Sequence, residues 1–124
     1  MNKQHHILIV DDDASGRKSL EIVLTAKGFQ VKSASKDTEA LEILETFSPD
    51  VLILDWMIED SISGLELAMV IREDRPQIPV ILITGYPSEE LEKQTRQFPK
   101  MYFLAKPFRP QQMLAIIRSS LSGN

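Results

Sequence analysis

Five polar residues stand at or just after the ends of short apolar runs in this sequence, namely Asp11, Asp12, Asp55, Thr84 and Lys106. Clustered carboxylates raise one another's pKa unless a cation offsets their charge. Oxygen ligands without His or Cys select Mg²⁺, Mn²⁺ or Ca²⁺, and an open site with few protein ligands favours Mg²⁺. A carboxylate beside Mg²⁺ can attack phosphorus, and the transferring group then needs an ammonium and a hydroxyl opposite the metal. These residue types therefore predict phosphoryl chemistry.

Elements of two kinds must position these side chains, and the first kind is the apolar run. Three runs are continuous rather than alternating, which is typical of strands covered on both faces. One run alternates and is therefore expected nearer a sheet edge. The predicted strands are 7–10, 29–34, 51–54, 80–83 and 101–104.

Between these runs lie segments with helical spacing and helix-end signals. The first is predicted to follow Asp13 and to stop at Gly28. The second is capped by Asp37 and carries apolar residues at helical spacing as far as Phe47. The third starts with the capping box 63–66 and ends before Pro76. The remaining two are predicted to begin at Ser88 and at Pro110.

Five strand–helix units in strict alternation predict an α/β fold with a parallel sheet between two helical layers. We expect the flavodoxin-like (βα)5 three-layer sandwich with strand order 2-1-3-4-5, because the first, third and fourth runs are the most apolar. Ligands of such sheets lie beyond the carboxyl ends of the strands. The five polar residues should therefore meet at one edge, and Asp55 should be a reactive group rather than a turn former.

Four motifs carry a resemblance that covers essentially the whole chain: "VDDD" at 10–13, "LILD" at 52–55, "ILITG" at 81–85 and "FLAKPF" at 103–108. In this order and at these strand ends, they resemble the receiver domain of two-component response regulators. The resemblance implies one receiver domain over residues 1–124, with an ordered core at about 5–121.

The resemblance implies that Asp55 accepts a phosphoryl group from the phosphohistidine of a histidine kinase or phosphotransfer protein. Asp11 and Asp12 match the acidic pair that binds Mg²⁺ or Mn²⁺, together with Asp55. The backbone carbonyl of Met57 matches the third protein ligand of the family. Asp13 is expected at the N-cap of the first helix rather than in the metal site.

The resemblance also implies how the domain switches. Thr84 matches the switch hydroxyl, Lys106 the lysine that contacts the phosphoryl group, and Phe103 the aromatic residue that turns inward on activation. Core packing is the alternative role of Phe103. The Lys106–Pro107 bond is expected to be cis. The fourth and fifth helices with the fifth strand would form the signalling face, and a homodimer through this face is a further expectation.

The sequence departs from the family after Asp55, because Glu59 stands where a Pro is usual and Gly64 arrives one residue late. The path of this loop is therefore open. One hypothesis is that the Glu59 and Asp60 charges modulate cation or partner binding. A second concerns Met57 and Tyr86, whose large side chains flank the expected path of the hydrolytic water and predict slow autodephosphorylation.

Two alternative functions fit part of the same pattern. Asp11 and Asp13 also form the D-x-D of haloacid-dehalogenase-like Mg²⁺ phosphatases, but such enzymes need a longer chain and a further acidic motif. The other alternative is a non-phosphorylated interaction module of the same fold. We therefore expect a signalling domain rather than an enzyme that turns over a substrate.

The amino-acid composition narrows the remaining classes of function and partner. The net charge of −4 gives no sign of direct nucleic acid binding, and the absence of cysteine excludes thiolate chemistry. No signal peptide or membrane span is visible, so the expected location is the cytoplasm. A downstream output domain or protein is expected as a partner. The sequence leaves open whether the chain is a stand-alone receiver or a piece of a longer regulator.

Overall fold

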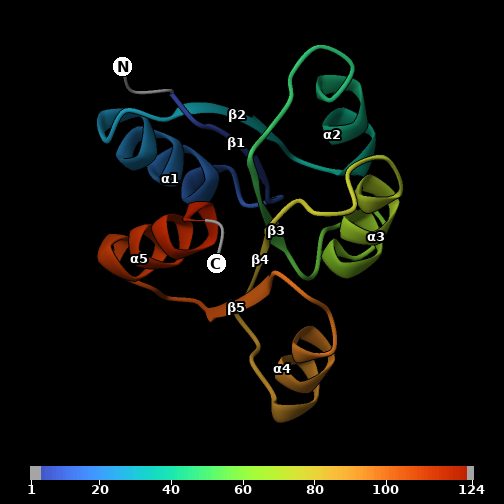
Figure 1. The fold of residues 1–124 in the computed structure, drawn as a ribbon. Helices are drawn as coiled ribbons and strands as arrows, with labels where there is room; N and C mark the ends of the chain where they lie inside the picture. The colour runs from blue at the N-terminus through green and yellow to red at the C-terminus, as the bar shows by residue number, and fades with distance from the viewer. Residues whose placement is uncertain (1–3, 123–124) are drawn as a thin grey trace.

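The computed structural model describes residues 4–122, which form a single parallel sheet enclosed by helices (Figure 1). Strands and helices alternate without exception along these residues, as the sequence predicts. Their bounds are β1 His6–Val10, α1 Ala14–Ala26, β2 Gln30–Ala34, α2 Asp37–Ile43, β3 Val51–Asp55, α3 Gly64–Asp74, β4 Val80–Thr84, α4 Glu89–Arg96, β5 Met101–Ala105 and α5 Pro110–Leu121.

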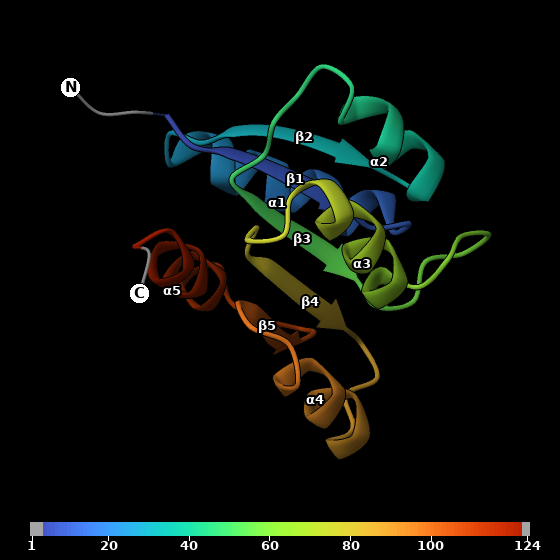
Figure 2. The same cartoon turned by 45° about the vertical axis from the view of Figure 1, so that its right-hand side comes forward.

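The strand order is β2-β1-β3-β4-β5, with every neighbouring pair parallel. This order confirms the flavodoxin-like prediction and places the alternating run, β2, at one edge. Helices α1 and α5 cover one face of the sheet, and α2, α3 and α4 cover the other (Figure 1). The strand arrows point to the same edge, where the loop between β3 and α3 projects (Figure 2).

Alternate residues of each central strand face opposite helical layers, so the sheet has two cores. One core joins Leu52 and Leu82 to α2, α3 and α4, and the other joins Ile53 and Ile81 to α1 and α5. All five residues of β3 and all five of β4 are buried. This double burial is the physical reason why the runs are continuously apolar.

Several helix ends follow the predicted signals. Gly28 follows the C-cap of α1 with φ +97, a conformation that glycine adopts without steric cost. Ser63 and Glu66 form the capping box of α3, and the Ser88 hydroxyl accepts the Leu91 N–H at the start of α4. Asp13 occupies the N-cap position of α1, although its side chain makes no capping hydrogen bond.

The prediction for α2 was wrong at both ends. The N-cap is Lys36, and Asp37 is the first helical residue. The helix ends at Ile43, and the N–H groups of Glu45 and Thr46 bond to carbonyls only three residues back, which tightens the chain into a turn. Phe47 is buried outside the helix and stacks on the His6 ring, with ring centroids 5.0 Å apart.

None of the helices within residues 4–122 combines the length and apolar character needed to cross a lipid bilayer.

Candidate functional site

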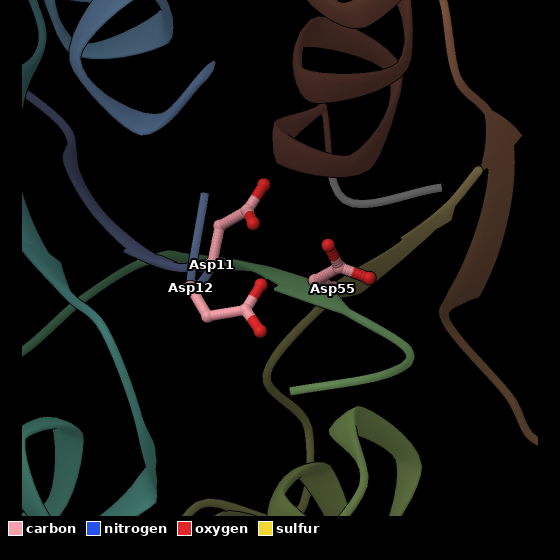
Figure 3. Close-up of side chains that lie close together, drawn as sticks. All are labelled: Asp11, Asp12 and Asp55. Carbon is pink, nitrogen blue, oxygen red and sulfur yellow. The ribbon is translucent and has the colours of Figure 1, made fainter. Parts of the chain in front are cut away.

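Three carboxylates meet at the carboxyl edge of the sheet, where β1 and β3 end (Figure 3). Asp11 and Asp12 follow β1, and Asp55 is the last residue of β3. One oxygen from each of the three lies within 4.8 Å of the others. Asp11 and Asp55 are buried, whereas Asp12 is exposed at the mouth of the site. The sheet order thus joins residues that are far apart in sequence.

Lys106 crosses the site from the end of β5 and neutralises part of this negative charge. Its Nζ donates hydrogen bonds to Asp55 Oδ2 at 2.8 Å and to Asp11 Oδ2 at 3.0 Å. The side chain of Lys106 is 27% exposed, while those of Asp11 and Asp55 are 4% and 9% exposed. One ammonium therefore serves two nearly buried carboxylates, and the cluster keeps an excess of negative charge.

Burial raises the pKa of the Asp55 carboxyl, and the neighbouring Asp11 carboxylate raises it further, while Lys106 opposes the rise. For Lys106, burial favours the neutral amine, but the hydrogen bonds to Asp55 and Asp11 outweigh it and raise the pKa of its ammonium. A bound cation would relieve the repulsion between the carboxylates. The electrostatics of the site therefore favour a metal ion or another positive group.

The local fold fixes Asp55 through its main chain and its side chain. The Met57 N–H donates to Asp55 Oδ1 at 3.2 Å. Gly64, the first residue of α3, lies so close to the Asp55 backbone that an added Cβ would stand 2.2 Å from the Asp55 carbonyl oxygen. The Gly64 N–H also donates to the Trp56 carbonyl at 2.9 Å. Glycine is thus required where α3 packs on the end of β3.

Asp11 is held by contacts that sequence reasoning did not identify. Its Oδ1 accepts the Asp13 N–H at 2.9 Å, and its carbonyl accepts a hydrogen bond from Arg17 Nη1 at 2.6 Å. The Asp11 N–H donates to the Ala34 carbonyl of β2. An arginine one turn into α1 carries no distinctive sequence signal, because most such residues are solvated.

Thr84 ends β4 and is buried, and its hydroxyl accepts the Tyr86 N–H at 3.0 Å. The Lys106 N–H donates to the Thr84 carbonyl at 2.7 Å, which joins the ends of β4 and β5 at the site. The Lys106–Pro107 peptide bond is cis.

Phe103 lies on β5 on the side of the sheet that faces α4, and it packs against the core. Its ring makes an edge-to-face contact with the Trp56 ring, with centroids 6.5 Å apart and an interplanar angle of 71°. Trp56, to which sequence reasoning gave no role, directly follows Asp55 and is buried. The residue next to the carboxylate therefore touches the expected switch aromatic.

Two other expected residues border the site with their side chains in solvent. Met57 is 63% exposed and Tyr86 is 79% exposed. A hollow of about 640 Å³ lies between Asp12, the β3–α3 loop and Leu91 of α4. Of the residues predicted from the sequence, Asp12 and Met57 line this hollow. Asp11, Lys106 and Pro107 line a second hollow of about 530 Å³ beside α1 and the start of α5.

The donor set fits a hard divalent cation. The three grouped ligands are carboxylate oxygens, and among residues 4–122 no histidine belongs to the group. Such oxygens suit Mg²⁺ or Mn²⁺, and the exposure of Asp12 leaves room for waters that Mg²⁺ retains. The carbonyl of Met57, two residues past Asp55, remains a predicted further ligand.

A parallel sheet of order 2-1-3-4-5 with this acidic cluster and a lysine at its carboxyl edge has the architecture of CheY-like receiver domains. The model of the response regulator receiver domain matches residues 7–118. The chain belongs to this family, whose members act in two-component signal transduction, as the sequence motifs predicted.

Curated relatives include a probable transcriptional regulator, ycf27, of Cyanidium caldarium, 38% identical over 120 residues. The phosphate regulon transcriptional regulatory protein PhoB of Pseudomonas aeruginosa is 31% identical over 117 residues. These alignments cover 96% and 93% of this chain, but only 47% and 51% of the relatives. The chain thus spans about half the length of these curated relatives.

Solved structures show the same fold along most of the chain. A CheY-like receiver domain protein from Methanospirillum hungatei has a TM-score of 0.87 at 28% identity, covering 97% of this chain and 95% of that one. A putative response regulator from Chloroflexus aurantiacus also has a TM-score of 0.87 at 30% identity, with 97% and 99% covered.

Proposed function

We propose that Asp55 is the phospho-acceptor of this receiver domain, which comprises the whole chain of 124 residues. The observation that carries the proposal is the position of the Asp55 carboxylate. It stands at the end of a fully buried strand, hydrogen-bonded to the Lys106 ammonium that also contacts Asp11, and close to the carboxylates of Asp11 and Asp12. Burial of the strand holds the nucleophile still, while the mouth of the site stays open to a donor.

In the proposed reaction, a carboxylate oxygen of Asp55 attacks the phosphorus of a phosphohistidine on a histidine kinase or phosphotransfer protein. The phosphorus–nitrogen bond breaks, and the electron pair returns to the imidazole. Mg²⁺ or Mn²⁺, held by Asp11, Asp12, Asp55 and the Met57 carbonyl, would neutralise charge on the phosphoryl oxygens. Lys106 already contacts Asp55 and would move with little displacement onto a phosphoryl oxygen.

Phosphorylation of Asp55 would change the positions of the Thr84 and Phe103 side chains. The Thr84 hydroxyl would turn from the Tyr86 N–H toward the phosphoryl group, and Phe103 would move into the space behind it. Phe103 on β5 pairs in register with Leu82 on β4, two residues before Thr84. The side chains of Thr84 and Phe103 therefore come from neighbouring strands. Their movement would change the face formed by α4, β5 and α5, for a downstream partner or for a homodimer.

The proposal also covers the partner of the chain and the compartment in which it acts. Curated relatives include proteins named as DNA-binding response regulators, such as MtrA of Mycobacterium leprae, of which this chain covers 53%. We propose that an output domain or protein supplies any DNA contact, because this chain carries a net charge of −4. The proposed phosphoryl donor places the reaction in the cytoplasm.

Intact mass after incubation with acetyl phosphate and Mg²⁺ tests the proposal. The wild type should gain the mass of one phosphoryl group, and Asp55→Asn should gain none. Asp74→Asn, which changes an exposed carboxyl at the end of α3, is the matched control and should behave as the wild type. A wild type that stays unmodified would instead favour a non-phosphorylated interaction module.

We further propose that the aspartyl phosphate is long-lived. Met57 and Tyr86 carry large, exposed side chains two residues past Asp55 and Thr84, where we expect them to hinder the approach of the hydrolytic water. Replacing both by alanine should shorten the half-life of the acyl phosphate, measured by intact mass after removal of the donor. An unchanged half-life would contradict steric shielding.

A further inference from the structure

The loop between β3 and α3, residues 56–63, is bound to the acidic cluster by main-chain donors. The Met57 N–H donates to Asp55 Oδ1 at 3.2 Å, and the Glu59 N–H donates to Asp12 Oδ2 at 2.8 Å. The second bond is the shorter one, and it joins residues 47 positions apart. The loop therefore does more than connect two elements, because it contacts two of the three carboxylates.

The rest of the loop is fixed in a way that holds the Glu59 N–H in place. Asp60 has φ +56, a left-handed conformation that reverses the chain directly after Glu59 and that Asp tolerates better than most residues. One residue later, the Ser61 hydroxyl accepts the Asp37 N–H at the start of α2 at 3.2 Å. Ser63 then begins the capping box of α3. These contacts fix the chain after the donor, and the bond from the Met57 N–H to Asp55 fixes it before the donor.

Asp12 depends on this loop more than its neighbours do. Asp11 is oriented by Lys106 and by the Asp13 N–H, and Asp55 by Lys106 and the Met57 N–H. Within residues 4–122, the Glu59 N–H is the one hydrogen-bond donor to the Asp12 carboxylate. An exposed carboxylate without such a donor would sample several rotamers.

We propose that the main-chain N–H of Glu59 is a positioning donor for the metal site, fixing Asp12 so that its other oxygen faces the cation or a water of the cation. The inference rests on the metal binding proposed above and assigns part of that site to the β3–α3 loop. Hydrogen bonds that orient metal ligands commonly change metal affinity by an order of magnitude. The family usually has proline at this position, and proline has no N–H to donate.

Two substitutions at one position separate the N–H from the side chain. Glu59→Ala removes the charge and keeps the N–H, whereas Glu59→Pro removes both. MgCl₂ titrations followed by amide chemical shifts in NMR give the dissociation constant of each variant. Glu59→Pro should bind Mg²⁺ about tenfold more weakly than Glu59→Ala. Equal affinities, or tighter binding by Glu59→Pro, would overturn the proposal.

A measurement on the wild type keeps the test valid if the proline variant changes the path of the loop. Amide hydrogen exchange should be slower at Glu59 than at Asp60, whose N–H has no partner among the described residues. The difference should persist in saturating Mg²⁺, because the N–H and the cation are expected to use different oxygens of Asp12. Equal exchange rates at the two amides would contradict the proposal.

The outcomes also separate this inference from the proposed function. If MgCl₂ shifts no amide near Asp55 in the wild type, the metal-dependent function itself fails. If the wild type binds Mg²⁺ and is phosphorylated while both Glu59 variants bind equally, only the positioning role fails. Asp60→Ala, compared with Glu59→Ala, tests separately whether the acidic side chains of the loop raise cation affinity.

Discussion

Replacing Lys106 by methionine should destabilise the fold in a pH-dependent way. At 2.8 Å, the attraction between the ammonium and Asp55 is about 6 kcal/mol at an effective dielectric constant of 20, before desolvation is subtracted. Removing one partner of a buried pair costs about 3–5 kcal/mol, and the partial exposure of Lys106 lowers this range. We therefore expect a loss of about 2–3 kcal/mol in the free energy of unfolding near neutral pH.

The sign of the pH dependence follows from the carboxylates. In the wild type, the pKa of Lys106 is raised, so its contribution is complete below the ordinary lysine pKa and disappears only as pH rises through the folded value. In Lys106→Met, the pKa of Asp55 rises further, because the opposing ammonium is gone. The deficit against the wild type should grow as pH rises from the Asp55 pKa of the wild type to the higher pKa of the variant, and it should be smallest at acidic pH, where Asp55 is protonated in both proteins.

Urea denaturation of both proteins at several pH values measures this deficit. Near neutral pH, the midpoint of Lys106→Met should fall by about 1–2 M. Lys93→Met changes an exposed lysine on α4 and should shift the free energy by no more than about 0.5 kcal/mol. A deficit of equal size at every pH would refute the electrostatic reasoning, and so would an unchanged midpoint.

Two further predictions concern the scaffold around the site. Gly64→Ala should lower the free energy of unfolding by at least about 2 kcal/mol, because its Cβ would overlap the Asp55 carbonyl oxygen. Thermal denaturation measures this loss, and Gly85→Ala, which has open space around the new Cβ, is the control that should not show it. Arg72→Ala should cost about 1–3 kcal/mol in urea, because Arg72 donates three hydrogen bonds to two main-chain carbonyls. Arg96 is exposed and, among the described residues, pairs only with a glutamate one turn away, so Arg96→Ala should lower the free energy of unfolding by about 0.5 kcal/mol or less. Equal losses for Arg72→Ala and Arg96→Ala would contradict this ranking.

The fold was largely predictable because burial on both faces of a sheet leaves a strong pattern. Val51 to Leu54 and Val80 to Ile83 are uninterrupted apolar runs, and each becomes a central strand. The edge strand β5 reads as equally apolar although it is only partly buried, so the sequence did not separate its two faces. The end of α2 was missed because Phe47 has helical spacing but packs on His6 instead.

The site was predictable in its side chains but not in its main-chain bonds. The positions of Asp11, Asp55 and Lys106 follow from strand order alone, because parallel strands bring their carboxyl ends to one edge. The bond from the Glu59 N–H to Asp12 depends on the path of an irregular loop, which no residue type encodes. Likewise, the Trp56–Phe103 contact required knowledge of how β3 and β5 lie across β4.

Because Lys106 is shared between two carboxylates that precede it in the chain, the acidic cluster forms before its ammonium is available. Lys106 is 95 residues from Asp11 and 51 residues from Asp55. During synthesis, a chain that ends before β5 already contains both carboxylates but has no ammonium to place between them. Its N-terminal strands would pair early, yet the repulsion at their ends would persist until the last strand docks. The acidic cluster therefore lacks its ammonium until β5 is in place, and in the proposed mechanism a chain without β5 would lack the lysine that faces Asp55.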